Sequence, residues 1–304
     1  MINFALINFS DLDMQEFDNL IRFCAHRFDT IPFCSNCMMS QCRKCSSNNC
    51  YNCLTHIHSI HTTEEHYSCE KITYNYILKH GYRYVSEMAW AFSDIKKYVD
   101  FSEPLNIFSV GSGPCTELYG AVAVYQNKPL LFCGFDQSSI WLPLQHFNKE
   151  NFKDKPVTIE YPDCDFIEFV KNNNLKCDIL VLNYFLSDFI KYQPQECESF
   201  IRELIALIRE GRFSTILIND VMLLYNTGTG YACMEKIARQ LKTNNNISFD
   251  CQRRHFAVPN EFQFEYGSKH NDSIGFRPIL EEAQPFGPFE TCGSIQLIIR
   301  TIKN

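Results

Sequence analysis

The chain has 304 residues, 45% of them hydrophobic and 21% charged, so it is long and apolar enough to bury a large core. This composition excludes a disordered polymer, and we expect no membrane span because no run approaches roughly 18 apolar residues. The formal net charge of −7 argues against broad non-specific binding to nucleic acid, since such binding depends on Lys and Arg neutralising phosphates.

The first residues do not resemble a secretory signal. No basic residue precedes the short apolar stretch in MINFALINF, and acidic residues follow it directly. We therefore expect a cytoplasmic protein. Residues 10–28 are predicted to form a helix, because Ser10 with Asp13 resembles a capping box and apolar residues recur at helical spacing. These apolar residues are Phe17, Leu20, Ile21, Cys24 and Phe28.

Residues 34–69 lose all hydrophobic periodicity and are rich in Cys and His. The cysteines from 34 to 53 follow the spacing C-x2-C-x4-C-x2-C-x4-C-x2-C, and thiolate pairs two residues apart can bind a tetrahedral zinc ion. Disulfides are rare in cytosolic proteins, so this clustering favours a metal. An iron–sulfur cluster is the alternative, but histidines at zinc-finger spacing favour zinc. We expect two or more zinc ions.

The run from Cys42 to His61 resembles the B-box zinc modules, in which ligand pairs alternate between two ions. The first connection is shorter here than in that family. The resemblance implies one zinc ion held by Cys34, Cys37, Cys50 and Cys53, a second held by Cys42, Cys45, His58 and His61, and His56, His66 and Cys69 as further candidate ligands. A closed four-ligand site leaves no position for water, so these ions are expected to be structural. The module then serves either as a platform for a protein partner or substrate, or only as a staple for the N-terminal region.

The rest of the chain alternates between helical and strand patterns. Residues 74–92 have helical spacing interrupted by Gly81, which predicts one or two helices. After Pro104, short apolar runs separated by helical stretches are typical of an α/β domain with a mostly parallel sheet. The runs are NIFSV, LLFCGF, PVTIEY, CDILVLN, STILIN and SIQLIIRTI.

The clearest helix precedes the fifth run, where Phe200, Ile201, Leu204, Ile205 and Ile208 form one stripe and Gly211 follows as a stop. Residues 253–293 have no clean period and are predicted to be irregular, with a candidate substrate-facing loop. The eight cysteines from Cys115 to Cys292 show no paired spacing and are predicted to be buried as small hydrophobic residues.

The segment from Asn106 to Glu117 is an apolar strand that runs into a glycine turn and then a helix. Glycine is needed at Gly111 and Gly113 because the backbone must approach a ligand closely. Asp136 ends the next strand, 23 residues after Gly113, where a carboxylate can accept the two ribose hydroxyls of an adenosine. The spacing therefore predicts an adenosine-binding site.

With these motifs, residues 104–304 resemble the class I S-adenosylmethionine methyltransferases. The resemblance implies an α/β, Rossmann-like, mostly parallel seven-stranded sheet flanked by helices, in which SIQLIIRTI is a terminal antiparallel strand. It implies that S-adenosylmethionine is bound by Gly111, Ser112, Gly113, Asp136, Gln137, Asp163 and Asn183. The run CDILVLNYFLSD looks like the fourth motif of the family, so Asn183, Tyr184 and Asp188 are the candidate catalytic residues.

The sequence departs from this family at two places. Ser109 stands where an acidic residue is common, two positions before Gly111. Phe-Leu follows Asn183 and Tyr184 where many amino-methylating enzymes have Pro-Pro-Tyr, so the acceptor atom stays open. Asp165 is as good a candidate as Asp163 for the adenine contact.

Three functions stay open. The first is methyl transfer to a protein, an RNA or a small molecule, with a protein slightly favoured by the acidic charge. The second is aminocarboxypropyl transfer, because the Gly-Ser-Gly-Pro turn is also similar to that of nicotianamine synthases. The third is a methyltransferase-like binding or assembly protein without catalysis, which the serine at position 109 favours. The predicted organisation is an N-terminal helical segment (1–33), a zinc module (34–69), a helical connection (70–103) and the methyltransferase-like domain (104–304).

We predict that metal analysis of the purified protein finds at least two zinc ions per chain. Cys34→Ser or Cys50→Ser should make residues 34–69 sensitive to protease, because this segment has little apolar content that could replace the metal. Cofactor binding by residues 104–304 should largely survive. Less than one zinc per chain, or a parallel loss of metal and of cofactor affinity, would contradict this prediction.

Overall fold

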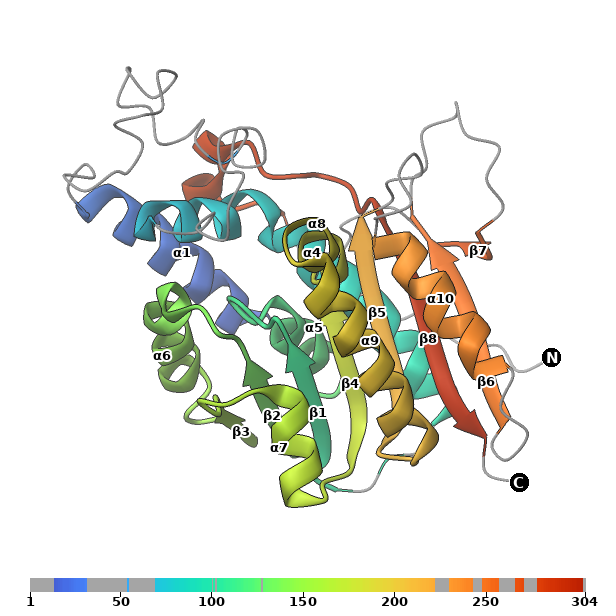
Figure 1. Ribbon diagram of the computed structural model, residues 1–304. Coiled ribbons are helices and arrows are strands. Elements are labelled where there is room, and N and C mark those ends of the chain that lie inside the picture. Colours follow the sequence, from blue (N-terminus) through green and yellow to red (C-terminus); the bar gives the residue numbers. More distant parts are fainter. Residues whose placement is uncertain are drawn as a thin grey trace.

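A single large sheet organises the protein. The computed structural model describes residues 14–31, 54, 69–99, 101, 103–126, 128–221, 230–242, 248–256, 266–270 and 278–302. Within these residues, eight strands form one sheet in the order β3-β2-β1-β4-β5-β8-β6-β7, with helices on both faces (Figure 1). The fold is therefore α/β with a mostly parallel sheet, consistent with a Rossmann-like architecture.

The first five strands are parallel to one another. They are β1 (Leu105–Val110), β2 (Leu130–Phe135), β3 (Val157–Glu160), β4 (Cys177–Asn183) and β5 (Phe213–Val221). The last strand, β8 (Ser294–Ile302), inserts antiparallel between β5 and β6 (Ser248–His255). β7 (Ser268–Lys269) pairs with β6 at the edge of the sheet. The resemblance to the methyltransferases implied this antiparallel terminal strand, and the structure confirms it.

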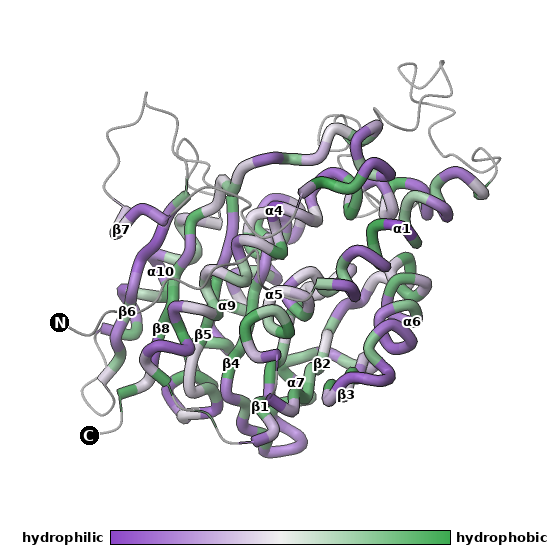
Figure 2. The backbone as a smooth tube through the Cα atoms, turned by 180° about the vertical axis from the view of Figure 1, so that it is seen from behind, coloured by the Kyte–Doolittle hydropathy of each residue, from purple (hydrophilic) through white to green (hydrophobic). Residues whose placement is uncertain are grey.

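The helices separate into two layers. The described helices are α1 (Gln15–Thr30), α4 (Glu70–Tyr98), α5 (Thr116–Val124), α6 (Leu142–Asn151), α7 (Phe166–Asn173), α8 (Leu186–Tyr192), α9 (Pro194–Arg209) and α10 (Gly230–Lys242), with short 3-10 helices η4 (Ser139–Trp141) and η5 (Glu281–Phe286). Helices α7 to α10 cover the face seen in Figure 1, whereas α1, α4, α5 and α6 are nearer the viewer in Figure 2. No described helix is long and apolar enough to cross a membrane.

Alternation along the strands divides the core between these two layers. Successive side chains of a strand point to opposite faces, so a sheet covered on both faces is apolar at consecutive positions. Ile107, Val181, Leu217 and Ile298 belong to the core under α1, α4 and α5. Phe108, Leu182, Ile218 and Leu297 belong to the core under α8, α9 and α10. Because both faces of these strands are buried, their sequences are continuous apolar segments without alternation.

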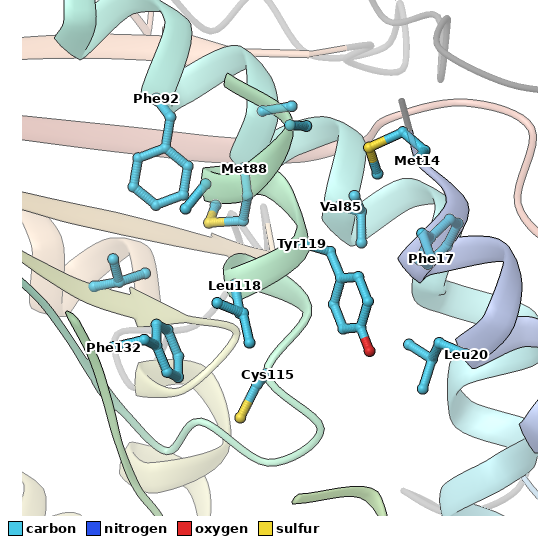
Figure 3. Packing of buried hydrophobic residues seen from close by; sticks show 14 of the residues in the cluster. Met14, Phe17, Leu20, Val85, Met88, Phe92, Cys115, Leu118, Tyr119 and Phe132 are labelled. Atoms are coloured by element: carbon cyan, nitrogen blue, oxygen red, sulfur yellow. The ribbon is translucent and has the colours of Figure 1, made fainter. Parts of the chain in front are cut away.

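Helices α1 and α4 pack into the same core as β1 and β2. Phe17 of α1 contacts Tyr119 of α5 with ring centroids 5.8 Å apart, and Met88 of α4 lies beside α5 (Figure 3). The two helices α4 and α5 approach closely because residue 120 is glycine: a Cβ atom there would lie 2.6 Å from the Cβ of Met88. Sequence segments before residue 104 therefore contribute to the same core as the parallel strands.

Several elements differ from the sequence predictions. The sheet has eight described strands, where seven were expected; the two-residue β7 is too short to leave a sequence pattern. β6 and η5 extend into the segment predicted to be irregular, because the polar β6 lies near the sheet edge and has no apolar run. Residues 70–98 form one continuous helix through Gly81. The first helix begins at Gln15, and Ser10 and Asp13 lie outside the described residues.

The cysteine predictions are confirmed only in part. Six of the eight cysteines from Cys115 onwards are buried, but Cys164 is exposed and Cys251 is half-buried. The proposed zinc ligands other than Cys69 all lie outside the described residues, and Cys69 itself is the N-cap residue of α4. Among the residues that are described, no group of three or more Cys, His, Asp or Glu side chains could hold a metal ion.

The close approach of α4 and α5 makes a paired glycine test. Gly120→Ala should lower the free energy of unfolding by about 1–2 kcal/mol, because a Cβ would also lie 3.0 Å from the backbone nitrogen of Ala89 and the helices must separate. Gly81→Ala in α4 should instead raise it by roughly 0.5–1 kcal/mol, since its Cβ would meet its nearest neighbours at 3.5 Å. Denaturant unfolding measures both; equal effects would contradict the packing described for α5.

Candidate functional site

The candidate site lies where the order of the parallel strands reverses. β1 stands between β2 and β4, so the connections after β1 and β4 run to opposite sides of the sheet. In open α/β sheets, ligands bind in the crevice outside the carboxyl ends of the strands at this switch point. The glycine turn follows β1 there, and Asn183 is the last residue of β4. A separate pocket of about 160 Å³ beside Leu130 and Val157 lies at the opposite, amino ends of β2 and β3.

The turn after β1 needs residues in the left-handed region. Gly111 and Gly113 have φ values of 63° and 44°. A Cβ on Gly111 would lie 2.3 Å from the ring of Phe185, and one on Gly113 would lie 3.4 Å from Trp141. A side chain is therefore disfavoured at both positions by backbone strain, and at Gly111 also by the Phe185 ring. The two aromatic rings border the turn.

Asp136 is tied to this turn. Its carboxylate accepts hydrogen bonds from the backbone amides of Gly113 (2.8 Å) and Ser138 (2.9 Å), while burial raises its pKa. A carboxylate has about four lone-pair positions, so two remain for other donors, such as a pair of hydroxyls. The Ser112 side chain, which is buried in the same turn, interacts with the thiol of Cys115. This edge of the turn therefore offers a carboxylate acceptor with free lone-pair positions.

Two other predicted cofactor residues are more open to solvent. Gln137 and Asp163 are exposed. Asp165 accepts a hydrogen bond from the amide of Glu168 at 3.0 Å and caps α7. The cap gives Asp165 a structural role, so Asp163 is the better candidate for a ligand contact.

Asn183 joins three elements. Its side-chain nitrogen donates to the hydroxyl of Thr116 (3.1 Å), and its oxygen accepts from the amide of Asn219 (2.8 Å). These bonds hold the end of β4 to the start of α5 and to β5. The side chain is thus placed as a positioning residue of the turn.

Tyr184 adopts φ 53°, which is rare for a residue with a side chain. Its hydroxyl donates to Glu87 of α4 at 2.8 Å, and its ring stacks on Tyr84 with centroids 3.9 Å apart. Its backbone amide donates to the carbonyl of Asn219 at 2.7 Å. Tyr184 therefore couples the end of β4 to α4.

Asp188, the third candidate catalytic residue, is half-buried and makes no hydrogen bond to any residue that the structure describes. Burial raises its pKa to about 6, against the opposing charge of Lys191. The neighbouring Asp220 also has its pKa raised to about 6 by burial, although it accepts the amide of Ser187 at 2.9 Å. Asp188 is thus a carboxylate available to a ligand.

Two carboxylates of this site were missed from the sequence. Glu117 in α5 accepts a hydrogen bond from the Ser109 hydroxyl (2.5 Å), and burial raises its pKa to about 7. It places a carboxylate beside the strand position where the resembling family often has an acidic residue. Glu87 of α4 was read only as part of a helix. No local sequence signal marks Glu87, because its partners Tyr184, Asn219 and Gly293 lie far away along the chain.

Comparison with known proteins gives weak similarities. No protein-family description matches the chain, and no curated protein matches it. Among solved structures, plantazolicin methyltransferase BpumL in complex with SAH is 14% identical and covers 95% of this chain and 99% of its own, with a TM-score of 0.40. Precorrin-6y C5,15-methyltransferase from Geobacter metallireducens GS-15 is 12% identical, covering 70% and 86%, with a TM-score of 0.37. Human methyltransferase 10 domain containing protein is 8% identical, covering 71% and 81%, with a TM-score of 0.41.

Similarities at these identities and TM-scores assign no function by themselves. The strand order, the glycine turn and the carboxylates around it are therefore the basis of any assignment.

The raised pKa of Glu117 predicts a pH-dependent stability. Its folded pKa of about 7 exceeds the ordinary value of 4.5. Between these two pH values the folded state holds a proton that the unfolded state has lost. The free energy of unfolding therefore falls as pH rises over this range and levels off above about 7. Glu117→Gln should thus be more stable than the wild type at pH 8 by about 2–3 kcal/mol, with the difference vanishing below pH 4.5. Denaturant unfolding across this pH range measures it, with exposed Glu196→Gln as the control; a pH-independent difference would contradict it.

Proposed function

We propose that this protein is an S-adenosylmethionine-dependent methyltransferase. The observation that carries the proposal is the hydrogen bond from the Gly113 amide to the Asp136 carboxylate, at the switch point of the sheet. It joins the two segments whose sequences resemble the first and second motifs of the class I enzymes. A glycine turn and an acidic strand end at this place form the usual adenosine-binding arrangement of such sheets.

The residues of the site have separate roles in this proposal. Gly111 and Gly113 let the backbone approach the cofactor, and Asp136 orients its ribose. Asp163 and Gln137 extend the contact toward the adenine. Bound S-adenosylmethionine supplies a methyl group already activated on a sulfonium, so the protein mainly has to align the acceptor with that carbon.

The hydrogen bond between Ser109 and Glu117 bears on the alternative of a binding protein without catalysis. That alternative was favoured by Ser109, which replaces an acidic residue of the resembling family. Because the Ser109 hydroxyl donates to Glu117, a carboxylate is still present at this position in space. The argument against catalysis is therefore weaker. Aminocarboxypropyl transfer uses the same cofactor and stays the second candidate, which the product mass distinguishes.

The zinc module remains part of the proposal on its sequence alone. Ten of its eleven candidate ligands lie outside the described residues, so its pairing and its ion count are left to metal analysis. We propose that it is structural or recognises a protein partner, since closed four-ligand sites hold no reactive water.

Cofactor binding tests the proposal directly. Asp136→Ala should weaken S-adenosylmethionine binding measured by calorimetry by about 2–5 kcal/mol, because two charge-assisted hydrogen bonds to the ribose would be lost. Asp154→Ala, which removes an exposed carboxylate between α6 and β3, should leave the affinity unchanged. Undetectable binding to the wild type, or equal affinity of the Asp136 variant, would overturn the assignment.

A further inference from the structure

A group of aromatic side chains stands beside the glycine turn without a role in the proposed cofactor contacts. Tyr76 and Tyr84 of α4 lie with ring centroids 5.6 Å apart, and Tyr84 stacks on Tyr184 at 3.9 Å. Tyr76 also lies 5.9 Å from Trp141, which borders Gly113. These four aromatic residues, Tyr76, Tyr84, Trp141 and Tyr184, are called the aromatic wall. They connect the turn after β1 with the end of β4.

The aromatic wall is accompanied by negative charge. Asp188 and Glu117 both lie near enough to Tyr76 to raise the pKa of its hydroxyl, although burial is the larger cause. Asp188 makes no hydrogen bond within the described part of the chain. Lys191, whose charge opposes the raised pKa of Asp188, is exposed, and its ammonium lies 4.8 Å from the ring centroid of Tyr192. At the other end of the aromatic wall, the charge of Arg83 acts on Tyr184 and opposes the rise of its pKa on burial. Lys191 is thus the cation that acts on Asp188, and it is exposed.

The rings of the aromatic wall and the Asp188 carboxylate together favour one class of ligand. The faces of aromatic rings attract cations, and a half-buried carboxylate without a partner gains most from an ammonium group. A phosphate or carboxylate ligand would be repelled by Asp188, which is ionised at neutral pH. A neutral apolar ligand would remove water from Asp188 and give nothing in return. An alkylammonium group satisfies both the rings and the carboxylate.

We propose that the aromatic wall and Asp188 bind an alkylammonium group of the methyl acceptor, so that an amine nitrogen receives the methyl group. This inference rests on the proposed function and names its substrate class. The source of the amine is either a free alkylamine or a lysine side chain, which share this chemistry.

The transfer balances with the residues present. The bound ammonium first gives one proton to the Asp188 carboxylate, which frees the lone pair of the nitrogen. This lone pair forms the new nitrogen–carbon bond, the carbon–sulfur bond breaks, and its electron pair stays on sulfur as a neutral thioether. Asp188, with its pKa raised to about 6, is ionised at neutral pH and can take the proton.

Binding of two matched probes tests the inference. Protein loaded with S-adenosylhomocysteine should bind n-pentylamine at least about tenfold more tightly than 1-pentanol, which has nearly the same shape without charge. Asp188→Asn should weaken n-pentylamine binding by about tenfold and leave S-adenosylhomocysteine affinity within about twofold. Asp188→Glu should retain most of the preference. Asp154→Asn makes the same chemical change at an exposed site and should change neither affinity.

The aromatic wall has its own pair of variants. Tyr76→Phe keeps the ring and should keep amine affinity, whereas Tyr76→Leu should weaken it by roughly fivefold or more. This pair keeps the inference open to test if Asp188→Asn fails to fold. Affinity for n-pentylamine should also fall as pH drops below about 6, since Asp188 then loses its charge. Asp220, Tyr76 and Lys191 are the other titratable groups that interact with Asp188. The Asp188→Asn variant should lose this pH dependence, because these other groups are unchanged in it.

Product analysis separates the two amine sources. With labelled S-adenosylmethionine, the full chain should methylate n-pentylamine or a lysine-containing peptide, and should leave a single-stranded oligonucleotide unlabelled. Normal S-adenosylhomocysteine binding without preference for n-pentylamine over 1-pentanol would overturn this inference and leave the proposed function standing. Labelling of the oligonucleotide alone would also overturn it. Failure to bind S-adenosylhomocysteine at all would remove the proposed function, and this inference with it.

Discussion

A buried carboxylate, that of Glu87, connects the elements on which the site depends. It accepts hydrogen bonds from the Tyr184 hydroxyl (2.8 Å), the Asn219 side chain (3.1 Å) and the backbone amide of Gly293 (2.8 Å). A buried carboxylate without such donors would cost several kcal/mol, so these three segments must stay close to α4. The ends of β4 and β5 and the approach to β8 are thereby held in one arrangement. Helix α4 is thus as much a part of the site as the strands are.

The same arrangement explains why acidic groups can gather at one edge of the sheet. Asp136 and Asp220 are satisfied by backbone amides, and Glu117 by the Ser109 hydroxyl, which offsets much of the cost of their burial. Burial nonetheless raises the pKa of each of these groups. Asp188 differs, because it has no hydrogen-bond donor within the described residues. This lack of a donor is the basis for proposing a cationic ligand at Asp188.

The glycine turn shows how local sequence and tertiary packing combine. Positive φ at Gly111 and Gly113 follows from the sequence, since glycine tolerates this region without a steric penalty. The packing of Phe185 and Trp141 against the two glycines does not follow from it. These rings come from the segments after β4 and β2, which the parallel sheet brings to the same edge. Tertiary packing therefore fixes the side chains that border the turn.

The sequence by itself determined the apolar runs of β1 to β5 and β8, the mostly parallel sheet, the turn at Gly111 and the acidic strand end at Asp136, because each is written in local periodicity or in a backbone requirement. It did not determine β6 and β7, whose residues lie near a sheet edge and need no apolar pattern. Only the tertiary structure decided that Glu87 meets Tyr184, Asn219 and Gly293, or that Glu117 lies against Ser109. The reason is physical: partners 97, 132 and 206 residues from Glu87 meet only after the sheet has formed, so no local pattern records them.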